Sequence, residues 1–180
     1  LGVTGGMAAY KMPNVAHALV KLGADVHVLM TKNATEFIAP LVFETLTNRR
    51  CIVDTFDRNF QYDVAHVSLA NAADLMLIAP ATANVLAKLA HGITDTAVCM
   101  SAKAHLRQNR PLLIALASND AMSANLENIA RLLNRKNIYF VPMRQDDPEK
   151  KPHSLVADFS KTIPAYEAML QGKQLRPLFL

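Results

Sequence analysis

The order of secondary structure in the first 30 residues constrains the fold more than any other feature of this chain. Residues 1–3 are typical of the end of a buried strand, and the segment Thr4-Gly5-Gly6 interrupts that strand. Residues 8–22 carry apolar side chains at helical spacing, and Gly23 is suited to end the helix. Residues 25–30 then form a second apolar strand. This order predicts a parallel sheet with right-handed crossovers.

The same alternation continues along the rest of the chain. Apolar runs predict strands over residues 75–79, 112–116 and 138–141, with Pro80 ending the first and Pro142 closing the last. Helical segments follow them over residues 85–90, 126–133 and 158–170. Residues 144–153 are polar and are predicted to form a surface loop. We therefore predict the α/β class, with a Rossmann-like doubly wound parallel sheet in a single domain over residues 1–180.

Charge and cysteine usage argue against several classes of function. The 180-residue chain has a formal net charge of +4, and its longest basic runs are Arg49-Arg50 and Lys150-Lys151. This pattern does not favour nucleic acid as a partner. Two cysteines make no disulfide framework, and the sequence has no Cys/His cluster for a metal ion. No apolar run could cross a membrane and no signal peptide is visible, so we expect a cytoplasmic protein.

Open α/β sheets bind ligands at the carboxyl ends of their strands, and four segments are predicted to lie there. After the first strand, Thr4-Gly5-Gly6 would let the backbone approach a ligand; the alternative is a tight turn without one. After the second strand, Thr31 and its neighbours Lys32 and Asn33 could hold a phosphate. The alternative there is a helix cap.

The two remaining segments follow the third and fourth strands. Residues 79–84 are mostly small, which leaves room for a flat ring, while Thr82 and Asn84 could bond to its polar edge. The alternative is a helix that begins at Pro80 with a threonine cap. In residues 117–122, Asn119 could bind a carboxylate or an amide, or a helix cap could be formed by Ser118 or one of its neighbours.

Two histidines and both cysteines remain to be assigned. His66 lies shortly before the third strand, and a lone histidine of this kind is more often structural than catalytic. His91 precedes Gly92 near a helix end, where a cation interacts favourably with the helix dipole, so we interpret it as structural. Cys51 and Cys99 lie in apolar or helical surroundings and are predicted to be inert.

Taken together, these segments resemble the flavin-containing cysteine decarboxylase superfamily. That superfamily includes phosphopantothenoylcysteine decarboxylase and the lantibiotic peptidyl-cysteine decarboxylases. The similar strings are GVTGGMAAYK at residues 2–11, HVSL at 66–69, residues 73–84 with PATAN, and KLAHGI with Asp95 in the helix that follows. PATAN with an upstream histidine is the more specific part, and the resemblance covers roughly the first two-thirds of the chain.

The resemblance implies FMN as cofactor, held in a Rossmann-like sheet at a subunit interface. It also implies a homo-oligomer, a trimer or a dodecamer built from trimers. His66 would be the active-site histidine and would move protons, and Asn119 would hold the substrate carboxylate. The expected cofactor-binding residues are Thr4, Gly5, Gly6, Thr31, Pro80, Ala81, Thr82, Asn84, Ala117 and Ser118. The substrate would be phosphopantothenoylcysteine-like or a peptidyl-cysteine, and its oxidation to a thioaldehyde would precede loss of CO₂.

The last third of the chain departs from that pattern. The decarboxylases carry a Pro-x-Met-Asn-x-x-Met string after the fourth strand, and only Asn119 and Met122 match it here. The cysteine-bearing substrate clamp is absent. The B-type subunit of dipicolinate synthase is instead similar in four strings, at residues 136–142, 145–152, 119–121 and 172–175. Three hypotheses follow: an FMN-dependent decarboxylase, a protein that works with a dipicolinate synthase A-type partner, or a flavin-binding module without turnover.

Overall fold

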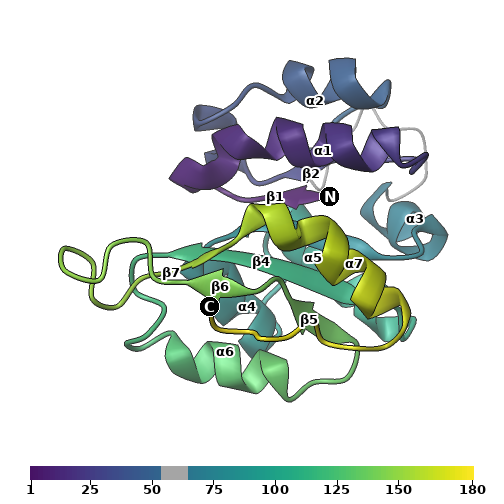
Figure 1. Cartoon of the computed structure of the whole chain (residues 1–180). Coiled ribbons are helices and arrows are strands. Elements are labelled where there is room, and N and C mark those ends of the chain that lie inside the picture. The colour runs from purple at the N-terminus through teal and green to yellow at the C-terminus, as the bar shows by residue number, and fades with distance from the viewer. Residues whose placement is uncertain (54–64) are drawn as a thin grey trace.

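The computed structural model describes residues 1–53 and 65–180, in which strands and helices alternate (Figure 1). The strands are β1 (Gly2–Val3), β2 (Leu29–Met30), β3 (Met76–Ala81), β4 (Leu112–Ser118), β5 (Ile138–Phe140), β6 (Met143–Arg144) and β7 (Leu155–Ala157). The α-helices are α1 (Met12–Lys21), α2 (Pro40–Thr47), α3 (Ala65–Ala72), α4 (Ala83–His91), α5 (Ala97–Arg107), α6 (Leu126–Leu133) and α7 (Thr162–Leu170). Short 3-10 helices are η1 (Met7–Lys11), η2 (Lys32–Glu36) and η3 (Phe159–Lys161).

The sheet is mainly parallel, as the sequence predicts. Strands β1 to β5 pair in parallel in the order β2-β1-β3-β4-β5. The winding direction reverses between β1 and β3, which makes the carboxyl ends of these two strands the topological switch point. An antiparallel extension, which the sequence analysis did not predict, is added where Ser118 of β4 pairs with Leu155 of β7, and β6 then pairs with β7.

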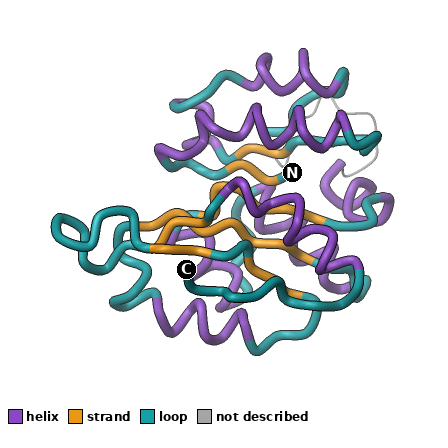
Figure 2. Tube along the Cα trace, viewed as in Figure 1, coloured by secondary structure: helices purple, strands orange, loops and turns teal. Residues whose placement is uncertain are grey.

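Helices cover both faces of this sheet (Figure 2). Successive side chains of a strand point to opposite faces, and β4 is buried on both. Its residues Leu112, Ile114 and Leu116 pack in the cluster that contains the apolar faces of α4, α5 and α6. Leu113 and Ala115 pack in a second cluster, with α1 and α7. The doubly wound arrangement is therefore confirmed.

Several element boundaries differ from those predicted. The prediction that Pro80 ends its strand is wrong, because β3 continues to Ala81. The pairing register between β3 and β4 shifts between Ile78 and Ala81, so the proline, which has no N–H, falls where regular pairing is already interrupted. The first predicted helix starts instead as the 3-10 helix η1, and Pro13 lies in the first turn of α1.

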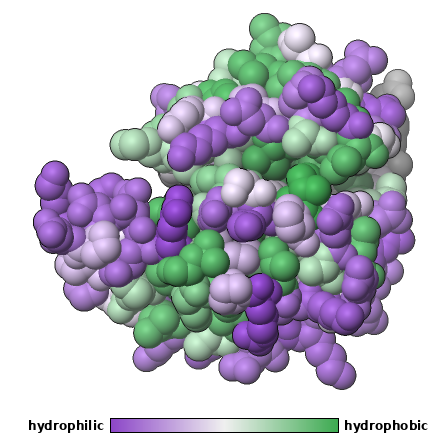
Figure 3. All heavy atoms as spheres, viewed as in Figure 1, coloured by the Kyte–Doolittle hydropathy of each residue, from purple (hydrophilic) through white to green (hydrophobic). Residues whose placement is uncertain are grey.

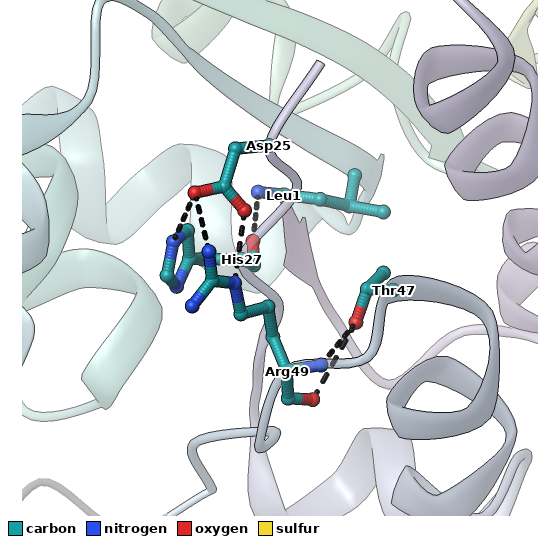
Figure 4. A network of polar contacts seen from close by, with 5 residues as sticks. All are labelled: Leu1, Asp25, His27, Thr47 and Arg49. Carbon is teal, nitrogen blue, oxygen red and sulfur yellow. Dashed lines mark hydrogen bonds and ion pairs between the residues drawn. The ribbon is translucent and has the colours of Figure 1, made fainter. Parts of the chain in front are cut away.

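A polar network joins two segments at the amino-terminal edge of the sheet (Figure 4). Asp25, which precedes β2, receives two hydrogen bonds from the Arg49 guanidinium, at 3.0 and 2.9 Å. His27 Nε2 lies 3.4 Å from the same carboxylate. The hydrogen bond from Arg49 is the main reason that the pKa of Asp25 lies below its usual value. These groups fasten the chain after α2 to β2, at the edge opposite the switch point.

The outer edge of β5 is completed by a side chain instead of a strand. The Phe140 N–H donates to Gln174 Oε1 at 2.8 Å, and Gln174 Nε2 donates to the Phe140 carbonyl oxygen at 2.6 Å. Farther along, the Met143 N–H donates to the Leu178 carbonyl at 2.8 Å, so the C-terminal segment borders the sheet at two places. The amide of Gln174 thus replaces the two hydrogen bonds that a neighbouring strand would make.

Replacing Gln174 by leucine should therefore destabilise the protein. Both backbone groups of the buried Phe140 would lose their partners, which costs about 2–4 kcal/mol of unfolding free energy in total. Chemical denaturation measures the loss. Gln171→Leu is the matched control, because Gln171 is exposed at the end of α7, and its change should stay within about 0.5 kcal/mol. Equal stability of the two variants would contradict this assignment.

Candidate functional site

The switch point is held together by the side chain of Thr4. This residue follows β1 directly and is fully buried. Its Oγ1 donates a hydrogen bond to the carbonyl oxygen of Pro80 at 2.6 Å and accepts one from the Thr82 N–H at 3.2 Å. One hydroxyl therefore fastens the turn after β1 to the end of β3, and fixes how the two carboxyl ends lie relative to each other.

The glycines allow the turn after β1 to pack against its neighbours. A Cβ atom on Gly5 would lie 2.5 Å from Cβ of Asn33 and 2.8 Å from its backbone carbonyl carbon, so no larger residue fits there. A Cβ atom on Gly6 would lie 3.1 Å from the Thr82 Cγ2 methyl. The segments after β1, β2 and β3 thus meet at one place, as expected for carboxyl ends of adjacent parallel strands.

Two of the predicted site threonines also act as caps. Thr31 is buried, and its Oγ1 accepts a hydrogen bond from the Ala34 N–H at 3.3 Å at the start of η2. Thr82 caps α4 through the Val85 N–H at 3.5 Å. Pro80 and Ala81 are buried within β3, whereas Asn84 is exposed on the first turn of α4. Both threonines are confirmed as caps, but the helix that Thr82 caps begins at Ala83 and not at Pro80. Contact of these residues with a cofactor remains a prediction.

The segment after β4 does not form the helix cap that its polar residues suggested. Ala117 and Ser118 belong to β4 itself, and α6 begins only at Leu126, so none of residues 118–120 caps it. Instead, Ser118 Oγ accepts a hydrogen bond from the Asp120 N–H at 3.1 Å, and the Asn125 side chain donates to the Asp120 carboxylate at 3.0 Å. These bonds shape a turn on which Asn119 is exposed.

The loop after β6 lies beside this turn. The Met122 N–H donates to the carbonyl oxygen of His153 at 2.9 Å, which fastens the two loops to each other. Figure 3 shows the surface indented on its left side, between the part that contains η1 and the projecting hydrophilic loop of residues 145–154. The carboxyl edge of the sheet opens toward this indentation. The exposed amides of Asn84 and Asn119 are thus presented at the edge where doubly wound sheets bind their ligands.

The histidines and cysteines lie apart from the switch point or outside the described side chains. His66 falls in α3, but its side chain lies outside the described part of the structure. His91 is the last residue of α4, where Gly92 adopts a left-handed conformation, and its Nδ1 lies 3.2 Å from Arg131 Nη1. Both cysteines are buried. Burial, with the negative charge of Glu44, raises the pKa of the Cys51 thiol to about 12, which disfavours the reactive thiolate.

The donors and acceptors at the switch point fit a flat cofactor that carries a phosphate. Glycines at the β1 turn bring backbone close to the surface, and hydroxyls, amides and the exposed Lys32 surround it. Within residues 1–53 and 65–180, no group of three or more His, Cys, Asp or Glu side chains could hold a metal ion. None of the helices in that same portion is long and apolar enough to cross a membrane.

Comparisons with known proteins agree with this arrangement. The model of the Flavoprotein family matches residues 1–167. The B-type subunit of dipicolinate synthase from Bacillus subtilis is 45% identical over 107 residues, which are 59% of this chain and 54% of that protein. The chain thus matches about half the length of that relative.

Solved structures extend the likeness over nearly the whole chain. The crystal structure of the B-type subunit of dipicolinate synthase from Bacillus halodurans has a TM-score of 0.87 and 33% identity, covering 99% of this chain and 93% of that one. The FMN-dependent cysteine decarboxylase SpaF has a TM-score of 0.77 and 30% identity, covering 94% of this chain and 93% of that one. Both lines of resemblance seen in the sequence are therefore confirmed.

Proposed function

Because the chain belongs to the Flavoprotein family, we propose that it binds FMN at the switch point and uses it to oxidise a small carboxylate-bearing substrate. The observation that carries this proposal is the meeting of three strand-end segments around Thr4. In flavodoxin-like sheets of the order 2-1-3-4-5 that bind FMN, the cofactor lies at the switch point between the first and third strands. The FMN prediction is supported by the family and by SpaF, which is described as FMN-dependent.

Bound FMN would supply the two-electron oxidation that no protein side chain provides. In this proposal the turn at Gly5 and Gly6, with Thr31, would hold the phosphate-bearing end of the cofactor. Thr82 and Asn84, with the segment at Ala117, would border its ring. Asn119 would donate its amide hydrogens to the substrate carboxylate, and His66 would accept or return the proton that moves during oxidation.

Two reactions fit this site, and different observations favour them. Dipicolinate synthesis with an A-type partner is favoured by the higher identity, by the TM-score of 0.87, and by the altered string around Asn119. Cysteine decarboxylation is favoured by His66, by the PATAN string and by the likeness to SpaF. Dipicolinate synthesis has the stronger support, whereas the sequence alone favoured the decarboxylase as the first hypothesis.

The assembly belongs to the same proposal. A homo-oligomer, trimeric or dodecameric, would place a second copy beside the flavin site, and exposed apolar side chains near that site could become buried in it. Met7 and Tyr10 on η1 are 79% and 61% exposed. Light scattering that yields the mass of a monomer would contradict the oligomer.

The free cysteines fit a reducing compartment such as the cytoplasm.

Parallel assays on one FMN-loaded preparation separate the two reactions. CO₂ release is measured with phosphopantothenoylcysteine and with a peptide that ends in cysteine, and dipicolinate formation is measured with dihydrodipicolinate and an A-type partner. Dipicolinate formed only when both proteins are present supports the first reaction, and CO₂ from either cysteine substrate supports the second. If the protein binds FMN but shows no turnover in any of these assays, it is a flavin-binding module, and the enzymatic proposal is contradicted.

A further inference from the structure

The loop of residues 145–154 is braced by contacts between its own two ends. The Asp146 N–H donates a hydrogen bond to Ser154 Oγ at 3.2 Å, and the Gln145 side-chain amide donates to the Pro152 carbonyl oxygen at 2.9 Å. Ser154 is fully buried, so its hydroxyl joins the two ends of the loop away from water. The strands β6 and β7 on either side pair with each other in antiparallel register. The loop is therefore a closed hairpin instead of an open connection.

A second set of contacts braces the outer part of the loop. The Lys151 N–H donates to the Asp147 carbonyl oxygen at 2.7 Å, and the Lys150 N–H donates to the Asp147 carboxylate at 3.1 Å. The Lys151 ammonium lies 2.5 Å from the Asp146 carboxylate, and this hydrogen bond is the main reason that the pKa of Asp146 lies below its usual value. The two side chains of this ion pair are 42% and 47% exposed, so the pair stabilises the closed loop less than the buried Ser154 hydroxyl does.

The braced loop is attached on both sides of Asn119. Leu155, the first residue of β7, pairs with Ser118 in the antiparallel register of β7 and β4. The Met122 N–H donates to the His153 carbonyl oxygen at 2.9 Å. Asn119 lies between these attachment points, one residue after Ser118 and three residues before Met122. The position of its exposed amide therefore depends on the shape of the loop.

We propose that residues 145–154 form a fixed wall beside the candidate site, and that Ser154 is a positioning residue that holds the Asn119 turn where the substrate carboxylate binds. This inference rests on the proposed function for the role of Asn119. A loop that is closed before the substrate arrives loses little conformational entropy on binding, which favours affinity. The wall should therefore be equally ordered with and without FMN. Ser154 acts through the turn and does not itself contact the substrate.

Limited proteolysis tests whether the loop is fixed. Trypsin cleaves the bond after Lys150 only when the loop opens, and mass spectrometry follows that one bond. With or without FMN, cleavage of the wild-type protein should be at least about 10²-fold slower than cleavage of a synthetic peptide of residues 144–154. Ser154→Ala should raise the rate about 5- to 10-fold, and Asp146→Ala about 2-fold. Wild-type cleavage as fast as that of the peptide, or protection that requires FMN, would overturn the fixed wall.

Two variants serve as matched controls. Ser101→Ala removes a buried hydroxyl of α5 that makes no hydrogen bond among the described residues, so it should not change the cleavage rate. Glu167→Ala removes an exposed carboxylate of α7, as Asp146→Ala does in the loop, and should also leave the rate unchanged. If Ser101→Ala opened the loop as much as Ser154→Ala, the bond between Ser154 and Asp146 would not be what closes it.

Hydrogen exchange and kinetics test the positioning role. In Ser154→Ala the Met122 amide loses its fixed acceptor and should exchange about 5- to 10-fold faster. With whichever substrate turns over, KM should rise about 5- to 10-fold, while kcat stays within about 2-fold and FMN affinity is unchanged. An open loop with unchanged exchange at Met122, or with unchanged KM, would overturn the positioning role. If the wild-type protein turns over no substrate, the proposed function fails, and that failure is distinguishable because proteolysis and exchange need no substrate.

Discussion

Replacing Thr4 by valine should lower the free energy of unfolding by about 2–4 kcal/mol and weaken FMN binding. Valine keeps the shape of threonine but removes the hydroxyl, which leaves the Pro80 carbonyl and the Thr82 N–H without the partner that joins them. Each unsatisfied buried group costs about 1–3 kcal/mol. The same hydroxyl positions the turn after β1 against the end of β3, where we propose that FMN binds. The affinity for FMN should therefore fall as well. Urea denaturation and FMN titration of the variant measure the two effects.

Two further variants make this result specific. Thr4→Ser retains the hydroxyl and should keep most of the stability. Thr45→Val removes an exposed hydroxyl of α2 that donates to the Leu41 carbonyl one turn earlier, so its effect should stay within about 0.5 kcal/mol. If Thr4→Val were as stable as Thr45→Val, the hydroxyl would not be what holds the switch point together.

Replacing His66 by asparagine should slow oxidation of the substrate by about 10²–10⁴-fold while FMN still binds. In the proposed function this histidine moves a proton during the reaction, and asparagine preserves polarity but cannot accept a proton at neutral pH. The measurement is the anaerobic bleaching rate of the bound flavin with whichever substrate turns over. A fall of that size corresponds to roughly 3–5 kcal/mol of activation free energy.

A structural role for His66 predicts a different outcome. The variant would then lose about 1 kcal/mol of stability, as expected for a helix terminus, with little change in rate. His91→Asn is the matched control, because His91 is exposed at the end of α4 and contacts Arg131 instead of the site. Equal rates for the two variants would remove the catalytic assignment of His66.

Elements with strong local patterns could be predicted, and elements without them could not. The helix over residues 126–133 matches α6 at both ends, because its apolar residues occupy one stripe and Ile129 and Leu132 are buried there. Helix α5 was missed because small buried residues extend around much of its surface, so no periodic stripe is visible. Strands β6 and β7 are two and three residues long, too short to carry a pattern, and only their pairing defines them.

The sequence predicts which segments contribute to the site, but not how their residues are arranged relative to one another. Its glycines and threonines follow apolar strands, and a parallel sheet brings the carboxyl ends of such strands to one edge. That Thr4 bonds to both Pro80 and Thr82 depends on the pairing of β1 with β3, which the sequence does not display.

Titration of the purified protein with FMN tests the central claim most directly. The claim is that the joined ends of β1 and β3 form a flavin site. We expect the visible absorption bands of FMN to shift and to saturate at one FMN per chain, with Thr4→Val requiring more FMN than Thr45→Val. A spectrum that stays identical to free FMN, at concentrations on the order of tens of micromolar, would contradict the account.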